Sequence, residues 1–245
     1  MYIHPQTIVG ELVANDYRTA TVFKSYDIDY CCNGQRSLEQ ACRHNGISID
    51  ALIDSLNSIP ADVLSGVADF NSWPVDLLAD YIEKKHHRYI RTKLKEIAPL
   101  LNKVAKQHGD KHPELWEIEG LFSESSFDLV DHLQKEEQML FPFVRKMVEA
   151  GNTKVHASFG RVENPVSVMM HEHDHEGGRF RRIAELTDNY NPPSDACNTY
   201  KVTLAMLREF EEDLHQHIHL ENNILFPKAI SMQQQHSGEW KRKAL

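Results

Sequence analysis

Two stretches of the chain share one motif, and this repeat limits what the chain can fold into. Each reads His-x-x-x-Glu-x-x-x-Leu-Phe-Pro, once from His132 to Pro142 and again from His217 to Pro227. A step of four residues is slightly more than one turn of an α-helix, so each histidine shares a helix face with its glutamate. One such pair is weak evidence, because exposed helices often carry polar pairs at this spacing. Two matched pairs are typical of carboxylate-bridged metal sites inside helix bundles.

A further histidine precedes each motif at nearly the same distance, His87 before the first and His173 before the second. The repeat therefore predicts two helical hairpins related by a pseudo-twofold axis. In the first helix, Leu78 and Ile82 lie on the face of His86, whereas Ile90, Leu94 and Leu101 lie on the face of His87. We choose His87 over His86. The predicted metal ligands are His87, His132, Glu136, His173, His217 and Glu221.

These polar residues occupy positions where a helix normally places apolar ones. On the last helix, His217 and Glu221 lie on one stripe with Leu214 and Leu225. A buried carboxylate is unfavourable unless it is paired or binds a metal. The alternative, core histidines hydrogen-bonded to their glutamates, would be preferred for a single pair but not for two matched pairs. The remaining histidines near the ligands lie two residues away and are predicted to be solvated: His171, His175, His215 and His219.

Composition excludes several classes of protein. The chain has 245 residues, of which 41% are apolar, and a formal net charge of −9, which argues against nucleic acid as a partner. No apolar run approaches the roughly 20 residues that span a membrane. The N-terminus lacks the basic and apolar pattern of a secretory signal, so we expect a cytoplasmic protein. The four cysteines, Cys31, Cys32, Cys42 and Cys197, are then expected to be thiols.

The predicted fold class is all-α: an up-down-up-down four-helix bundle behind a small N-terminal helical domain. The small domain covers residues 1–60, with a capping box at Ser37 opening one of its helices. A linker follows at residues 61–73, the bundle covers 74–231, and residues 232–245 form a loose tail. The four long helices are predicted over 74–107, 113–150, 165–188 and 194–231. Gly177 and Gly178, one turn after His173, leave room near the metals or allow close helix packing.

Imidazole and carboxylate ligands without thiolate suit iron, manganese or zinc. Two metal ions bridged by two glutamates, each with terminal histidines, fit a non-haem di-iron centre best. Six side chains leave coordination positions free for an oxo bridge and one small ligand.

The full pattern resembles the hemerythrin-like proteins, and in particular the repair of iron centres (RIC) family, also called ScdA or YtfE. The matching residues are the two motifs, Glu172-His173-Asp174, Asn222-Asn223, and the N-terminal Asp29-Tyr30-Cys31-Cys32-x-Gly34. The resemblance implies a hemerythrin-like bundle with two iron ions held by the six ligands. It also implies that Glu172 lines the route to the metals. The segment 107–126 departs from the family pattern, and the sequence assigns it no role.

The resemblance further implies a protein that repairs or protects iron–sulfur clusters damaged by nitrosative or oxidative stress. It would supply iron, or bind and reduce nitric oxide, and whether it is an enzyme depends on which of these it does. The partners implied are damaged iron–sulfur proteins, with nitric oxide or oxygen as a small ligand, and the chain is either a monomer or a homodimer. Two alternatives are an oxygen- or nitric oxide-sensing module and a bundle without metal. We expect a redox or partner-docking role for Cys31 and Cys32, with at least one thiol accessible; the alternative is a structural role in the small domain.

Overall fold

The computed structural model describes residues 3–60, 68–151, 153 and 155–237. Helices dominate this part of the chain, in which the only β-pairing is an isolated bridge between Ile8 and Ser37. No helix among the described residues is both long and apolar enough to cross a membrane. The predicted all-α class is confirmed.

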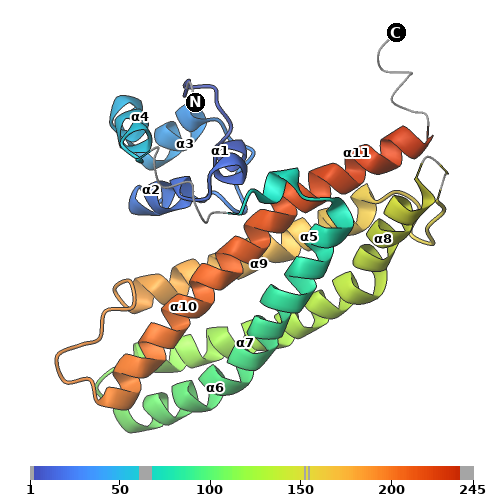
Figure 1. Cartoon of the computed structure of the whole chain (residues 1–245). Coiled ribbons are helices and arrows are strands. Elements are labelled where there is room, and N and C mark those ends of the chain that lie inside the picture. The colour runs from blue at the N-terminus through green and yellow to red at the C-terminus, as the bar shows by residue number, and fades with distance from the viewer. Residues whose placement is uncertain (1–2, 61–67, 152, 154, 238–245) are drawn as a thin grey trace.

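Four long helical segments lie side by side in the bundle (Figure 1). The segment that begins near Pro74 packs against the second and the fourth, and the second also packs against the third. Their elements are α5 (Val75–Tyr81), η3 (Ile82–His87) and α6 (Arg88–His108); α7 (Glu114–Lys135), η4 (Glu136–Leu140) and α8 (Phe141–Ala150); α9 (Glu163–Leu186); and α10 (Asn198–Leu220), η5 (Glu221–Leu225) and α11 (Phe226–Ser237).

The predicted loose tail begins too early. α11 continues to Ser237, so residues 232–237 are helical, while 238–245 lie outside the described residues. Glutamine is a good helix former, and Gln233 also accepts a hydrogen bond from the backbone N–H of Val162 at 2.8 Å. The third helix starts two residues before its predicted first residue, and the fourth starts four residues later, at Asn198.

The segment 107–126 extends two helices of the bundle. α6 ends at His108 and α7 begins at Glu114, so only a short turn separates them. Leu115, Ile118 and Phe122 are buried in the apolar core. The segment therefore adds core packing rather than a surface insertion.

The small N-terminal domain packs on the bundle (Figure 1). Its apolar residues, such as Phe23 and Leu38, belong to the same core cluster as Leu214 and Ile218 of α10. The predicted capping box at Ser37 is present, with Gln40 as its partner. The helices are α1 (Val9–Asn15), α2 (Thr19–Ser25), α3 (Leu38–Asn45) and α4 (Ile49–Asn57).

The predicted linker falls partly outside the described residues, at 61–67. Its last part contains a short 3-10 helix, η2 (Phe70–Ser72). Phe70 and Trp73 pack edge to face, and both rings contact Tyr81 of α5. These contacts attach the end of the linker to the bundle.

The bundle interior contains two apolar clusters with a polar layer between them. One cluster includes Ile90 and Phe180, and the other includes Ile82 and Met169. Along each long helix, the buried histidines and glutamates lie where one cluster gives way to the other. Apolar packing on both sides thus fixes the position of the polar layer along the bundle axis.

Candidate metal centre

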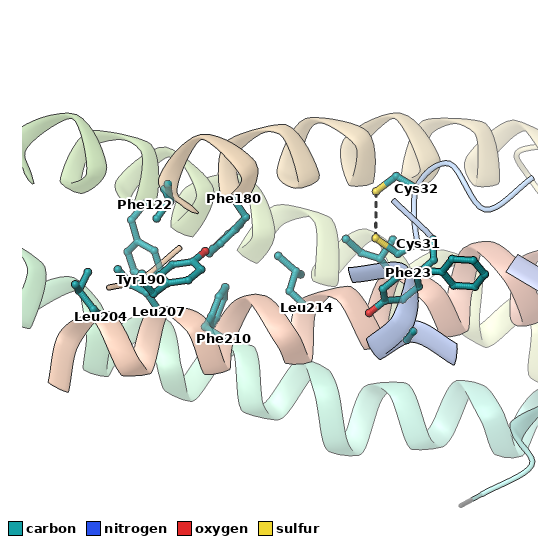
Figure 2. Close-up of a cluster of buried hydrophobic side chains, with 14 of the residues drawn as sticks. Phe23, Cys31, Cys32, Phe122, Phe180, Tyr190, Leu204, Leu207, Phe210 and Leu214 are labelled. Atoms are coloured by element: carbon teal, nitrogen blue, oxygen red, sulfur yellow. Dashed lines mark hydrogen bonds between the residues drawn. The ribbon is translucent and has the colours of Figure 1, made fainter. Parts of the chain in front are cut away.

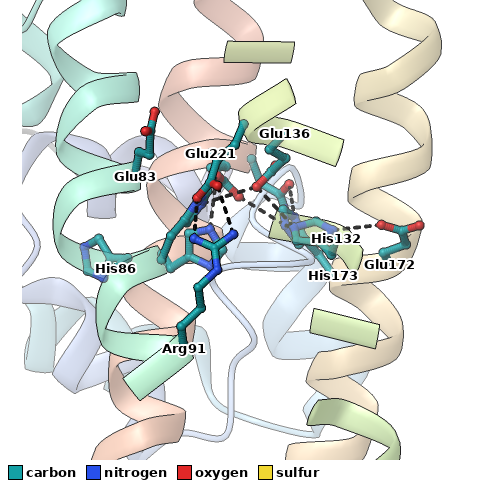
Figure 3. Close-up of polar contacts among 12 residues, drawn as sticks. Glu83, His86, Arg91, His132, Glu136, Glu172, His173 and Glu221 are labelled. Atoms are coloured by element: carbon teal, nitrogen blue, oxygen red, sulfur yellow. Dashed lines mark hydrogen bonds and ion pairs between the residues drawn. The ribbon is translucent and has the colours of Figure 1, made fainter. Parts of the chain in front are cut away.

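The structure brings the six predicted ligands together in the polar layer. Figure 3 labels His132, Glu136, His173 and Glu221 among them. Each is at most 3% exposed, although histidine and glutamate are rarely buried without partners. All four helical segments of the bundle contribute. The residues are His87 of η3, His132 of α7, Glu136 of η4, His173 of α9, His217 of α10 and Glu221 of η5.

Both carboxylates point to the middle of the cluster and contact imidazoles from several helices. Glu136 Oε2 lies 3.4 Å from His87 Nε2 and 3.4 Å from His132 Nε2. Glu221 Oε2 lies 3.1 Å from His173 Nε2, and Glu221 Oε1 lies 3.1 Å from His217 Nε2 and 3.8 Å from His87 Nε2. Every histidine of the cluster therefore turns its Nε2 atom towards a carboxylate.

The ligand atoms form two overlapping groups of four residues. His87 and His217 form one group with both glutamates, and His132 and His173 form the other with the same two glutamates. Within each group the ligand atoms lie within 4.8 Å of one another. Two groups that share both carboxylates have the connectivity of a carboxylate-bridged pair of cation sites.

The hydrogen bonding of these atoms also fits a cation. Among the described residues, neither Glu136 nor Glu221 has a hydrogen-bond partner for its buried carboxylate oxygens, and the same holds for the Nε2 atoms of His87 and His217. The Nε2 atoms of His132 and His173 face each other at 3.0 Å. Buried carboxylates without hydrogen bonds are strongly unfavourable unless a cation compensates their charge. The donor set therefore fits metal binding.

The opposite ring nitrogens of three histidines have their own partners. His87 Nδ1 donates to Glu137 Oε1 at 2.8 Å, and His132 Nδ1 donates to Glu172 Oε2 at 2.8 Å. His173 Nδ1 donates to Asn222 Oδ1 at 2.9 Å. A proton on Nδ1 leaves Nε2 with a free lone pair for a metal, so these contacts set the tautomer and the ring orientation.

Electrostatics within the cluster follow its mixture of imidazoles and carboxylates. Burial alone would lower the pKa of His87, but Glu136 and Glu137 hold it well above its usual value. Burial alone would raise the pKa of Glu221, but the imidazoles of His217 and His173 hold it well below. Strongly perturbed groups gathered in one buried layer are typical of functional sites.

The backbone widens into π-helical turns at the ligand positions. η3 ends at His87, η4 begins at Glu136 and η5 begins at Glu221. The Phe141 N–H bonds to the carbonyl of Glu136, and the Phe226 N–H bonds to the carbonyl of Glu221, in each case five residues back. Pro142 and Pro227 follow these turns and lack a backbone donor, and a wider turn accommodates the proline ring. The Leu-Phe-Pro ends of the two motifs thus coincide with a change in helical register.

The structure places His87, and not His86, among the ligand atoms. His86 is buried on another side of the same helix, and its Nδ1 atom contacts Asp213 Oδ2 at 3.0 Å (Figure 3). The prediction that the flanking histidines are solvated holds for His171 and His175 but is wrong for His219, which is 1% exposed. The sequence pattern missed this because the small domain covers that face of α10, and burial lowers the pKa of His219 to about 3. His215 is half-buried for the same reason.

Glu172 lies at the edge of the centre and beside a cavity of about 220 Å³. It contacts His132 and forms an ion pair with Lys135 at 2.6 Å, and these two contacts lower its pKa to about 2. The cavity also reaches His132 and His173 and is lined by further acidic side chains, among them Asp128 and Asp131. An acidic cavity that ends at ligand residues favours the entry and exit of cations.

The prediction that a thiol of Cys31 or Cys32 is accessible is wrong. Their residues are 3% and 7% exposed, because the turn that carries them is covered by α9 and α10 (Figure 2). The Cys32 thiol donates to the backbone carbonyl of His173 at 3.4 Å. A Cβ atom on Gly177 would lie 3.2 Å from this sulfur, so this glycine allows the turn to pack closely on α9. Two adjacent side chains can both be buried here because a second domain closes over them.

Three residues around the centre escaped the sequence analysis as functional groups. Glu137 orients His87 and is held by Arg91, whose guanidinium forms two hydrogen bonds to it, at 2.6 and 2.9 Å. Asn222 joins His173 to the small domain, because its Nδ2 donates to the Cys31 carbonyl at 3.1 Å. Glu137 and Asn222 each directly follow a predicted glutamate ligand, and Asn222 also belongs to the pattern that carries the family resemblance, but neither signal predicts these contacts.

Comparisons with known proteins agree with this architecture. Residues 5–60 match the ScdA_N domain, a domain of unknown function (DUF542), and residues 79–229 match the hemerythrin HHE cation binding domain. The iron-sulfur cluster repair protein ScdA of Staphylococcus haemolyticus is 30% identical over 223 residues, which cover 91% of this chain and 97% of that protein.

Two proteins named iron-sulfur cluster repair protein YtfE are similar over the same length. The protein of Musicola paradisiaca is 35% identical over 222 residues, which cover 91% of this chain and 95% of that protein. The protein of Enterobacter sp. (strain 638) is 32% identical over 223 residues, which cover 91% and 96%. The chain therefore belongs to the ScdA/YtfE family, and its bundle is a hemerythrin HHE cation-binding domain.

Proposed function

We propose that the bundle holds two iron ions and that the protein repairs iron–sulfur clusters damaged by nitrosative or oxidative stress. The observation that carries this proposal is the pair of overlapping ligand groups that share Glu136 and Glu221. The relatives ScdA and YtfE are named iron-sulfur cluster repair proteins, which supports the same function for this chain. Imidazole and carboxylate ligands bind ferrous iron well and leave it able to change oxidation state.

The side chains around the site would perform three tasks. His87 and His217 would hold one ion, His132 and His173 the other, and both glutamates would bridge them. Glu137, Glu172 and Asn222 keep protons on the Nδ1 atoms, so that the Nε2 atoms bind metal. The apolar clusters on both sides of the layer exclude bulk water from the ligands.

Iron supply is the form of repair that the site supports best. The cavity beside Glu172 connects the pair His132 and His173 to several carboxylates outside the centre. Carboxylates and water are ligands that exchange easily on ferrous iron. In this proposal the iron is cargo: it leaves through the acidic cavity and is captured by an iron-free cluster protein together with sulfide. The partner is thus a damaged iron–sulfur protein in transient contact.

The first test measures whether the six residues hold iron. The purified wild-type protein should contain about two irons per chain, one for each ligand group, and the Glu136→Ala/Glu221→Ala variant should lose most of them. Glu149→Ala, which removes an exposed glutamate of α8, is the control and should keep the full amount. Full iron retention by the double variant would show that the ligand assignment is wrong.

The second test measures transfer. The reduced, iron-loaded protein is mixed with an iron-free cluster protein, sulfide and a ferrous chelator as competitor, and cluster formation is followed by absorbance. We expect clusters with the wild type and none with the double variant. If the wild type keeps its iron, forms no cluster and binds nitric oxide reversibly, gas sensing replaces iron supply as the function.

A further inference from the structure

The turn between α2 and α3 gathers three further metal-binding side chains that the proposed function does not use. Cys31 Sγ and Cys32 Sγ lie 3.7 Å apart (Figure 2), and Cys31 Sγ lies 3.4 Å from Asp29 Oδ1. The ligand atoms of the three residues all lie within 4.8 Å of one another. None of the three belongs to the His/Glu centre of the bundle.

The sulfur–sulfur distance and the sulfur–oxygen distance match two edges of a tetrahedral metal site. With metal–sulfur bonds of about 2.3 Å and metal–oxygen bonds of about 2.0 Å, two sulfurs are separated by about 3.8 Å, and a sulfur and an oxygen by about 3.5 Å. We propose that Asp29, Cys31 and Cys32 form a second metal site, for a thiophilic divalent cation such as zinc or ferrous iron. The fourth position is left to solvent or to an exchanging ligand.

Asp29 is fixed for this role by contacts to both of its oxygens. The backbone N–H groups of Cys31 and Cys32 donate to Oδ1 at 3.2 and 2.9 Å, which turns this oxygen towards the thiols. Asn33 Nδ2 and Arg181 Nη1 donate to Oδ2 at 2.8 and 2.9 Å. The bond from the Cys31 thiol to Oδ1 is the contact that a metal ion would replace.

The charges around the turn balance when a divalent cation is bound. Two thiolates and one carboxylate carry three negative charges, which the cation and the guanidinium of Arg181 neutralise together. Without a cation, the Cys31 thiol donates to Asp29 Oδ1 and the Cys32 thiol donates to the His173 carbonyl, so both sulfurs carry protons. Metal binding therefore releases two thiol protons to solvent and involves no oxidation or reduction.

The site adjoins the bundle centre without sharing a residue with it. Cys32 Sγ contacts the carbonyl of His173, and Asn222 links the Cys31 carbonyl to the His173 ring. The two sites also differ in chemistry, because one offers thiolates and the other only imidazoles and carboxylates. Thiolate ligation by the turn therefore has its own spectroscopic signature.

Cobalt(II) distinguishes the two sites in the full-length protein. Co²⁺ is titrated into the reduced wild-type protein, and the thiolate-to-cobalt charge-transfer band in the near ultraviolet is recorded. We expect this band in the wild type and its loss in Cys31→Ser/Cys32→Ser. The matched controls Cys42→Ser and Cys197→Ser replace the other two cysteines of the chain and should keep it. Asp29→Asn retains an oxygen for the backbone N–H groups, and we expect roughly tenfold weaker cobalt binding or more.

A second measurement does not depend on the folding of any variant. Cys31 and Cys32 are buried, so their alkylation requires local opening of the turn and is slow. Zinc that binds the closed turn should slow this alkylation further, as detected by mass spectrometry, and a chelator should restore the rate. The proposal would be overturned if the wild type showed no thiolate band and zinc left the alkylation rate unchanged. It would also be overturned if the band were lost in the Cys42→Ser or Cys197→Ser variant. Iron content of the bundle is measured on the same samples. A protein that holds iron in the bundle but binds no metal at the cysteine turn would contradict this proposal and leave the proposed function standing.

Discussion

At the scale of single residues, the centre depends on side chains that do not reach its middle. Glu137, Glu172 and Asn222 each accept the Nδ1 proton of one histidine, and Arg91 holds Glu137 in place. In metal sites such outer partners fix ring orientation and raise the basicity of the ligand nitrogen. His217 has no such partner among the described residues, and its ring packs instead against the rings of His86 and His87.

Replacing Glu137 tests this outer layer. Glu137→Gln keeps an oxygen that accepts the His87 proton but removes the negative charge, so the metal affinity of the centre should fall about 10- to 100-fold. The affinity is measured by competition with a chelator of known strength. Glu149→Gln removes a charge from an exposed position of α8 and should leave the affinity unchanged. Equal affinities of Glu137→Gln and wild type would show that the Glu137 contact does not tune the metal site.

At the scale of elements, irregular helix geometry and glycine place the functional groups. The π-helical turns shift the helical register next to His87, Glu136 and Glu221. On α9, Gly177 lies under the cysteine turn, and its neighbour Gly178 does not. A Cβ on Gly177 would meet Cys32 Sγ at 3.2 Å, whereas a Cβ on Gly178 would meet only the tip of Arg181 at 4.0 Å.

The two glycines therefore form a matched pair of substitutions. Gly178→Ala should stabilise the protein by up to about 1 kcal/mol, because alanine is the better helix former. Gly177→Ala should gain less than Gly178→Ala, because its methyl group crowds the Cys32 sulfur, and alkylation of Cys32 should become faster. Denaturant unfolding and thiol labelling measure the two effects. Equal stabilisation by both variants, with Cys32 still unreactive, would show that Gly177 is not needed for the contact.

At the scale of the whole molecule, two neighbouring asparagines fasten the small domain to the bundle. Asn222 and Asn223 follow the ligand Glu221, and Asn223 Nδ2 donates to the carbonyl of Tyr30 at 3.1 Å. A Cβ on Gly10 or Gly34 would come within 2.6 Å of the Asn223 amide oxygen, so the small domain presents bare backbone at this contact. The motif that supplies the proposed ligand Glu221 thus also supplies the docking contact.

Asn223→Ala should loosen this docking and leave the bundle intact. The variant removes the donor to Tyr30, so we expect faster alkylation of Cys31 and Cys32, faster amide exchange in residues 29–34, and unchanged iron content. Asn198→Ala, which alters an exposed side chain at the opposite end of α10, is the control. Loss of iron from Asn223→Ala would show instead that the docked domain is required for metal binding.

The sequence by itself determined the helical class, the long helices and the residues that meet in the polar layer. Helical periodicity is local, so the four-residue step between His132 and Glu136, repeated at His217 and Glu221, specifies a shared face without any knowledge of the neighbours. The repeat of this His-x-x-x-Glu motif on a second helix then indicated that the two helix faces meet at one site. The sequence favoured His87 over His86 less clearly, because adjacent residues on the first helix both had apolar neighbours at helical spacing, and the structure places His87 in the His/Glu cluster.

Only the tertiary structure decided which residues are buried by the contact between the small domain and the bundle. Burial of Cys31, Cys32 and His219 depends on the small domain lying against α9 and α10, a contact between segments far apart in the chain. The roles of Glu137 and Asn222 likewise depend on rings carried by other helices. Hydrophobic periodicity shows which face of a helix is apolar. It cannot predict that a second domain packs on the polar face, because that face carries no apolar repeat.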